Sequence, residues 1–243
     1  MDIHIFILCY NEEVLLPNTI KFYKNRFPNC IITIYDNLST DESVSIAKKH
    51  NCNVISFNTN GENNVYIKRD LVNKCWNNIK KGWVIVADMD EWLDITIDDL
   101  INEYNNKTTI LKIKGIDMIG ESNNILLNDI DLDKINKYID NDFESKNICF
   151  LREKIVSMNY TCGHHKCKPT GIIKYSNKIY YLKHMNYLGL EFLINKMTNR
   201  YIRSINMQKK NLSRHYHEDK EKIIQDYNNK LISSKLIDKL FNN

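Results

Sequence analysis

The chain of 243 residues is predicted to form an α/β fold with a doubly wound, mainly parallel sheet and C-terminal helices. Two observations support this prediction. Short apolar runs rich in β-branched residues alternate with single amphipathic segments through the first half of the chain. Polar or acidic residues follow several of these runs, as is typical where parallel strands end at a ligand-binding edge.

The order of the elements follows from these patterns. Apolar runs predict four strands, at residues 3–9, 31–35, 53–57 and 83–87. Amphipathic segments predict helices, at residues 17–27, 41–50, 64–80 and 96–104. Ser39 and Glu42 have the spacing of a capping box for the second helix. Shorter apolar runs predict further strands, at residues 109–116, 148–150, 171–174 and 179–182. A polar irregular segment is expected over residues 122–147, and a helical pattern begins at Leu188.

Length and composition predict one catalytic domain over residues 1–215 and a helical extension over residues 216–243. The seven cysteines are an odd, scattered set that favours a reducing compartment over a disulfide framework. The first apolar run is too short for a membrane span and lacks the basic region of a signal peptide, so a cytoplasmic location is expected.

The basic residues are concentrated near the C-terminus. Residues 196–214 contain six Lys or Arg and no Asp or Glu, whereas the net charge of the whole chain is +4. Such a run predicts either a solvated helix face or a surface for phosphates, acidic acceptors or anionic lipid heads. The last of these would give peripheral membrane contact.

The most informative motif is Asp88-Met89-Asp90-Glu91, which follows the buried strand predicted at 83–87. Carboxylates so close in sequence repel each other unless water or a hard cation neutralises them. Mg²⁺ and Mn²⁺ commonly use one or two protein carboxylates together with substrate phosphates. The motif therefore predicts metal-assisted chemistry on a phosphate, with an acidic turn that caps the helix at 96–104 as the alternative.

Polar residues also follow the first two predicted strands. Tyr10, Asn11 and Glu12 come after the first, and Asp36 and Asn37 after the second. Because parallel strands end at the same edge, these residues and the acidic motif should lie together. None of the loops has a glycine-rich phosphate fingerprint, so neither a dinucleotide fold of the usual kind nor a P-loop is supported.

In order and spacing, these motifs make the sequence similar to the nucleotide-sugar-dependent glycosyltransferases of family 2, which have a GT-A fold. The subgroup with Asp-x-Asp-Glu followed by an aromatic residue is the best match. The matching segments are residues 9–12, 36–41 and 88–92, with looser matches at 115–118, 163–164, 182–184 and 200–203.

The resemblance spans most of residues 3–215. It implies transfer of a sugar from a nucleoside diphosphate, with UDP the first expectation, to a hydroxyl group of a glycan, glycolipid or protein. It also implies Mn²⁺ or Mg²⁺ as cofactor.

The resemblance also implies roles for individual residues. The nucleotide would be bound at the strand ends, by Tyr10, Asn11, Glu12, Asp36, Asn37, Asp88 and Met89. Asp90 would ligate the metal that bridges the diphosphate, and Asp88 would be a second metal ligand or would face the ribose or a metal-bound water. A late histidine would complete the metal shell, with His184 the first choice and His164 the second. Arg69 is a candidate for contact with the nucleotide or diphosphate, and an ordinary exposed helix cation is its alternative.

The transfer is expected to be inverting, although retention stays open. An inverting reaction needs a carboxylate base within reach of the acceptor hydroxyl. Asp117 ranks first because of its position beside Gly115, and Glu121 and Glu91 are the other candidates.

The residues also suggest other functions. A phosphatase or nuclease stays possible from the carboxylates alone, but no further metal-ligand histidines occur at recognisable spacing. A cluster of soft ligands would suit a zinc-binding interaction module, with Cys162, His164, His165 and Cys167 as ligands, but structural zinc normally uses two separated pairs. A nucleotidyltransferase would need a glycine-rich basic loop where residues 11–13 are acidic. Nucleic-acid binding is not expected, because the basic run has few interleaved aromatics beyond Tyr201 and Tyr216.

Overall fold

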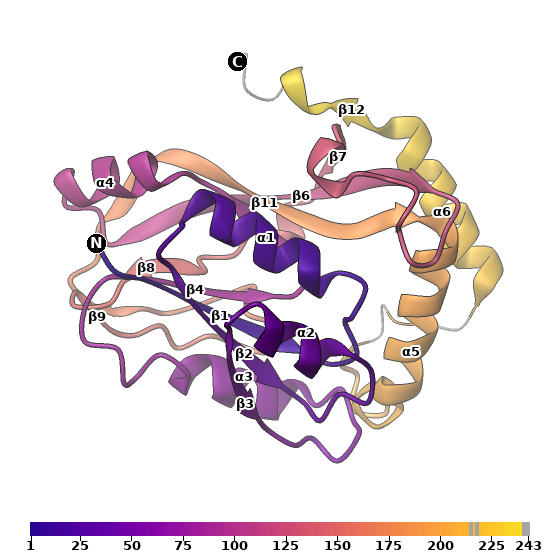
Figure 1. Cartoon of the computed structure of the whole chain (residues 1–243), viewed down its shortest axis with the longest axis horizontal. Coiled ribbons are helices and arrows are strands. Elements are labelled where there is room, and N and C mark those ends of the chain that lie inside the picture. The colour runs from indigo at the N-terminus through magenta and orange to yellow at the C-terminus, as the bar shows by residue number, and fades with distance from the viewer. Residues whose placement is uncertain (214–215, 217–218, 240–243) are drawn as a thin grey trace.

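Residues 1–213, 216 and 219–239 are described in the computed structural model (Figure 1). Their main feature is a mixed sheet in the order β12-β7-β6-β8-β4-β1-β2-β3, with β11 pairing with β5 and β6. The strands of this sheet are β1 (Ile3–Cys9), β2 (Ile31–Asp36), β3 (Asn53–Ser56), β4 (Trp83–Asp88), β5 (Glu91–Asp94), β6 (Ile110–Ser122), β7 (Lys137–Asp140), β8 (Cys149–Leu151), β11 (Tyr175–Gly189) and β12 (Lys235–Leu236). A separate pair is formed by β9 (Ile155–Ser157) and β10 (Thr170–Gly171).

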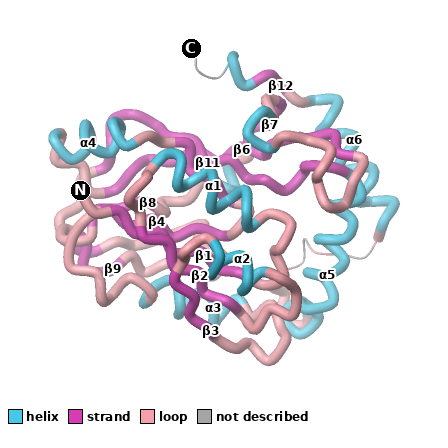
Figure 2. The backbone as a smooth tube through the Cα atoms, in the orientation of Figure 1, coloured by secondary structure: helices cyan, strands magenta, loops and turns pink. Residues whose placement is uncertain are grey.

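The helices connect or flank these strands. They are α1 (Leu16–Arg26), α2 (Ser43–Lys49), α3 (Val65–Lys74), α4 (Ile97–Asn105), α5 (Leu190–Gln208) and α6 (Lys220–Ser233), with short 3₁₀ turns at Leu132–Lys134, Asp142–Glu144 and Ile237–Lys239. Figure 2 shows α5 and α6 together at one end of the molecule, away from α4 and the N-terminus.

The predicted α/β fold is confirmed. The longest pairings are parallel, namely β1 with β2 and β4, and β6 with β11. Alternate residues of β1 enter different cores, because Ile5 and Ile7 pack in the same cluster as α1 and α2, whereas Phe6 and Leu8 pack with Val72 of α3. Helices therefore pack on both faces of the sheet, which is the doubly wound arrangement.

The first four strands begin where predicted and end within one residue of the prediction. Other elements differ from the prediction in where they begin or end, because tertiary contacts determine those positions. The strand predicted at 171–174 is wrong, because only Gly171 of these residues is in a strand. The third helix ends at Lys74 instead of residue 80. The capping box is also wrong, since Glu42 is the N-cap of α2 without a side-chain hydrogen bond and Ser39 instead accepts one from the backbone of Asn11.

Strands β6 and β11 are both longer than the sequence predicts. They pair with each other in parallel, and this pairing continues through the polar residues of β11. Close approach near their ends depends on Gly120 and Gly189. A Cβ on Gly120 would lie 2.6 Å from the carbonyl oxygen of Leu188, and one on Gly189 would lie 2.5 Å from that of Ser122.

The C-terminal helices are packed onto this part of the sheet. Ile223 and Tyr227 of α6 share a buried cluster with Ile119, Tyr187 and Leu193. The domain division after residue 215 stays a prediction, and residues 217–218 and 240–243 of the predicted extension lie outside the described residues. Within the described part of the chain, no helix has both the length and the apolar character needed to cross a bilayer.

Candidate active site

Two adjoining pockets lie beyond the ends of β1, β2 and β4. The first pocket has a volume of about 560 Å³, and its polar lining includes Tyr10, Asn11, Glu12, Asn37, Lys196 and Arg203. The second pocket has a volume of about 480 Å³, and its lining includes Asp90, Asp117, His164, His184, Asn186 and Lys230. Both pockets are lined by Asn63, Lys68, Asp88, Arg200 and Tyr216. Most of the predicted strand-end residues therefore border one two-part site, and these are Tyr10, Asn11, Glu12, Asn37, Asp88, Met89 and Asp90.

The loops of the first pocket are fixed by hydrogen bonds to each other. Asn11 has a left-handed backbone (φ 51°), and its side-chain oxygen accepts from the backbone of Thr40 at 2.8 Å. Asn37 donates to the Thr59 hydroxyl at 2.8 Å and accepts from the Thr59 backbone at 3.0 Å. These bonds leave a preformed polar wall where the nucleotide was expected.

Asp36 and Met89 are also predicted to bind the nucleotide, but only Met89 lines this pocket. Asp36 is buried, its carboxylate accepts from the Ser39 backbone at 3.1 Å, and among the described residues the pocket lining includes Asn37 but not Asp36. Met89 lines the first pocket, and its carbonyl oxygen accepts from the Thr19 hydroxyl at 3.0 Å.

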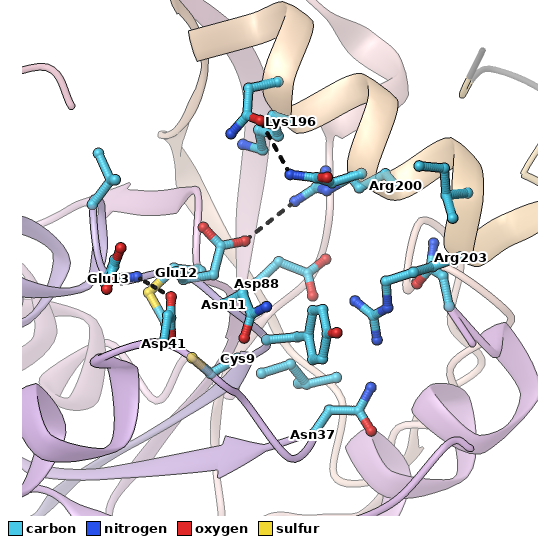
Figure 3. Close-up of a pocket in the computed structure, with 18 of the residues that line it drawn as sticks. Cys9, Asn11, Glu12, Glu13, Asn37, Asp41, Asp88, Lys196, Arg200 and Arg203 are labelled. Atoms are coloured by element: carbon cyan, nitrogen blue, oxygen red, sulfur yellow. Dashed lines mark hydrogen bonds and ion pairs between the residues drawn. The ribbon is translucent and has the colours of Figure 1, made fainter. Parts of the chain in front are cut away.

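Helix α5 supplies the cations of the first pocket. Lys196, Arg200 and Arg203 are spaced so that they share one helix face, and Figure 3 shows Arg200 and Arg203 reaching toward the loop after β1. The Arg203 guanidinium lies 3.2 Å from the centre of the Tyr10 ring. Arg200 lies 3.7 Å from the Glu12 carboxylate. This half of the basic run thus lines the pocket, while Arg214 lies outside the described residues.

Asp90 is the centre of a buried ion cluster. Its Oδ2 atom lies 2.6 Å from Lys196 and 3.1 Å from Arg200. Burial alone would raise the pKa of Asp90, but the charges of Lys196 and Arg200 and a hydrogen bond from His184 hold it well below its ordinary value. Asp90 is therefore a buried, ionised carboxylate.

His184 connects Asp90 with Asp117. Parallel pairing of β6 and β11 places Asp117 and His184 side by side, and the His184 Nδ1 atom lies 2.8 Å from Asp117 Oδ1. Its Nε2 atom lies 3.5 Å from Asp90 Oδ2, because Met185 donates to the Asp90 carbonyl where β11 pairs with β5. Burial alone would lower the pKa of His184, but Asp117 and Asp90 raise it to about 10.

The pair Asp90 and His184 fits a divalent cation. A carboxylate oxygen and an imidazole nitrogen converge there, and the other imidazole nitrogen is bonded to a carboxylate, as is usual for metal-ligating histidines. A cation between them would replace the proton on His184. Two protein ligands suffice where substrate phosphates fill the remaining positions.

The four predicted metal ligands do not converge on one point. In the part of the chain that the structure describes, no group of three or more His, Cys, Asp and Glu side chains could hold a metal ion. The zinc site proposed for residues 162–167 is therefore not formed. The Nδ1 atom of His164 is buried without a hydrogen-bond partner among the described residues, and burial lowers the pKa of His164 to about 4 although Asp88 opposes this.

Lys146 organises the carboxylates on the other side of the second pocket. It forms a close ion pair with Glu91 and lies 3.2 Å from Glu144 and 3.8 Å from Asp88. Burial opposes the charge of Lys146, but these three carboxylates raise its pKa above the ordinary value. Glu91 also accepts from the Asp88 backbone at 3.0 Å, so its carboxylate is committed to buried contacts.

Asp117 does not fit the predicted role of base. His184 binds its Oδ1 atom, and its Oδ2 atom lies 2.9 Å from Lys230 and 3.0 Å from Asn141. Burial alone would raise the pKa of Asp117, but His184 and Lys230 lower it to about 2. A carboxylate whose oxygens are both engaged in this way is a poor proton acceptor. Asp117 instead holds contacts with His184, Lys230 and Asn141.

Two other predicted residues are not brought to the site. Glu121 is largely exposed and pairs with Lys137 at 2.5 Å, outside the linings of both pockets. Arg69 is exposed and pairs with Asp70 at 2.6 Å. Lys68 lines both pockets in its place, because it lies four residues before the buried Val72 on the inward face of α3.

Sequence reasoning missed several residues of the site. The periodicity of α3 could have identified Lys68, and the three-residue spacing of Arg200 and Arg203 places these two on one helix face. Lys146, Tyr216, Asp226 and Lys230 carried no such signal, because the segments that contain them have no motif and reach the site only through tertiary packing.

Comparison with known proteins identifies the family. Residues 4–152 match the family model described as glycosyl transferase family 2. The chain is 27% identical over 93 residues to protein RfbJ of Shigella flexneri, in an alignment that covers 38% of this chain and 67% of RfbJ.

Solved structures also resemble the chain. S. aureus TarS is 14% identical, with a TM-score of 0.47 and coverage of 96% of this chain but only 44% of TarS. TarS 1–349 in complex with UDP-GlcNAc is 15% identical, with a TM-score of 0.46 and coverage of 96% and 73%. Glucosyl-3-phosphoglycerate synthase from Mycobacterium tuberculosis, in complex with Mn²⁺, UDP and glucosyl-3-phosphoglycerate, is 13% identical, with a TM-score of 0.34 and coverage of 47% and 44%.

The family match includes β1 to β4, their polar loops, and Asp88, Asp90 and Asp117. Because it covers more than half of the chain, the chain belongs to glycosyl transferase family 2.

Proposed function

We propose that the chain is a metal-dependent glycosyltransferase that moves a sugar from a nucleoside diphosphate, with UDP the first candidate, to a hydroxyl acceptor. The observation that carries this proposal is the group of cations where the two pockets meet. Lys68 and Arg200 line both pockets and Lys196 lines the first, beside the carboxylates Asp88 and Asp90. A diphosphate leaving group develops negative charge, which such a preorganised group of cations stabilises.

The first pocket would bind the nucleotide. The Tyr10–Glu12 loop and Asn37 would offer an aromatic ring and amide groups to the base and ribose, while Arg200 and Lys196 would face the diphosphate. Asp90 and His184 would hold Mn²⁺ or Mg²⁺, which supplies Lewis-acid charge to the leaving diphosphate when bound. We assign the chain to the Asp-x-Asp-Glu-aromatic subgroup, with support from the buried Trp92, whose indole donates to the Thr19 hydroxyl at 2.9 Å.

The second pocket would bind the acceptor. Most of its carboxylates pair with cations, and these are Asp88, Asp90, Glu91, Asp117 and Glu144. Asp226 differs, because it accepts from the Tyr187 hydroxyl at 2.9 Å and no Lys, Arg or His of the described residues lies within 4.0 Å of its carboxylate.

We therefore propose Asp226 as the base. It would remove the proton of the acceptor hydroxyl as that oxygen bonds to the anomeric carbon and the bond to the diphosphate breaks, with inversion. The seven unbonded cysteine thiols support the proposal of a reducing, cytoplasmic compartment. A glycan, glycolipid or protein acceptor and peripheral membrane contact stay proposals.

A thermal-shift screen of UDP, GDP and other nucleoside diphosphates, with and without Mn²⁺, tests the donor proposal. A ligand at about 100 times its dissociation constant stabilises the folded protein by about 2.7 kcal/mol. We expect the largest shift with UDP plus Mn²⁺. Asp90→Asn should abolish this shift, whereas Asp94→Asn should keep it, because Asp94 lies outside both pocket linings among the described residues. If no nucleotide shifts the wild-type melting temperature, the proposal fails.

A further inference from the structure

Helix α6 contributes a charged side chain to the cluster around His184. Lys230 lies 2.9 Å from Asp117 Oδ2, and the side chain of Asp117 is only 1% exposed. The other oxygen of Asp117 bonds to His184 Nδ1, and His184 Nε2 faces Asp90 Oδ2. Lys230, Asp117, His184 and Asp90 thus form one continuous series of contacts from α6 to the end of β4.

The position of Lys230 is fixed by the docking of α6. The Tyr227 hydroxyl donates to the Gly120 carbonyl at 2.7 Å, three residues beyond Asp117 on β6. The ammonium group of Lys230 lies 4.6 Å from the centre of the Tyr187 ring, three residues beyond His184 on β11. The helix therefore contacts both strands that carry the Asp117–His184 pair, which places Lys230 with little freedom.

These contacts determine which way the imidazole faces. Lys230 and Asn141 both bind Asp117 Oδ2, which leaves Oδ1 to accept from His184 Nδ1. With its proton on Nδ1, His184 directs Nε2 toward Asp90. A carboxylate behind a ligating histidine sets the tautomer and ring orientation in this way.

We propose that Lys230 is a positioning residue, which acts through Asp117 to hold His184 in the orientation that binds the divalent cation. This inference rests on the proposed function, because it takes Asp90 and His184 as the cation ligands. It makes α6 a part of the donor site, although the sequence placed this segment outside the catalytic domain.

The test is Mn²⁺ affinity in the presence of UDP, measured from the free-Mn²⁺ signal in electron paramagnetic resonance. Loss of a partner behind a metal ligand typically weakens affinity about 10- to 100-fold. We expect such a loss in Lys230→Met and in Asp117→Asn, with recovery of most affinity in Lys230→Arg. Lys235→Met is the matched control, because Lys235 forms a similar pair with Asp140 at 2.9 Å on the same C-terminal segment but outside both pocket linings among the described residues.

A second measurement separates positioning from loss of fold. The ¹⁵N shifts of the His184 ring report the hydrogen bonding of each ring nitrogen without any metal, and Lys230→Met should change them while thermal unfolding stays cooperative. Wild-type Mn²⁺ affinity in Lys230→Met, or an equal loss in Lys235→Met, overturns the inference and leaves the proposed function intact. Failure of the wild type to bind Mn²⁺ with any nucleoside diphosphate overturns both.

Discussion

The two pockets are adjacent, but they are held together by different interactions. In the first pocket, the loops after β1 and β2 are joined by hydrogen bonds that span 28 to 31 residues, such as Asn11 to Ser39 and Glu12 to Ser43. In the second pocket, several ion pairs join residues much further apart, such as Glu91 and Lys146, which are 55 residues apart, and Asp117 and Lys230, which are 113 residues apart.

This difference has energetic consequences. A hydrogen bond between partly exposed groups contributes about 1 kcal/mol, whereas removal of one partner from a buried ion pair leaves an uncompensated charge. The first pocket should therefore tolerate substitutions that alter ligand binding alone. In the second pocket, binding groups and stabilising groups are the same side chains, so most substitutions there should affect both properties.

The largest effect should come from Lys146→Met. Lys146 is 4% exposed and neutralises Glu91, Asp88 and Glu144, so its loss should lower the free energy of unfolding by about 3–5 kcal/mol. Urea denaturation measures this change. The control Lys137→Met breaks an exposed pair with Glu121 and should cost less than about 1 kcal/mol. Equal losses in the two variants would contradict the comparison.

Arg200→Ala should act mainly on binding. Arg200 faces both pockets and is 26% exposed, so the variant should fold while it loses a charge-assisted contact to the diphosphate. Such a contact is worth about 2 kcal/mol, which predicts a rise of roughly 30-fold in the KM for the donor. Higher ionic strength should also raise the KM of the wild type for the donor, because salt screens the attraction between Arg200 and the diphosphate. Arg69→Ala, which removes an exposed cation paired with Asp70, should leave KM unchanged; a similar rise there would reinstate Arg69 as a binding residue.

The smallest effect should be that of Asp94→Asn, at the far end of β5 from Asp90. Burial alone would raise the pKa of Asp94, but the charges and hydrogen bonds of Lys183 and Arg26 hold it below its ordinary value. A carboxyl group whose pKa is lower in the folded state stabilises the protein above its unfolded pKa, and this stabilisation disappears as the pH falls through the folded pKa. The variant should therefore lose about 1 kcal/mol at pH 7 and nothing at the acid limit. A stability difference that persists in acid would show that Asp94 acts through packing and not through charge.

Local patterns determined much of this protein. The strands of the first half, α1 and the polar strand ends could be read from the sequence, because apolar periodicity reports which face of an element is buried. The Asp88–Glu91 motif indicated the site for a similar reason, since its carboxylates lie at the end of a buried strand. The four-residue spacing to the buried Val72 would also have predicted that Lys68, and not Arg69, faces the site.

Only the tertiary structure decided which charges meet. His184 lies beside Asp117 because β6 and β11 pair in parallel, and near Asp90 because β5 pairs with the same strand. Lys146 and Lys230 reach the site from segments with no recognisable motif. The physical reason is that periodicity encodes burial within one element, whereas an ion pair needs two elements in register, and the register of distant strands and helices is set by the packing of the whole chain.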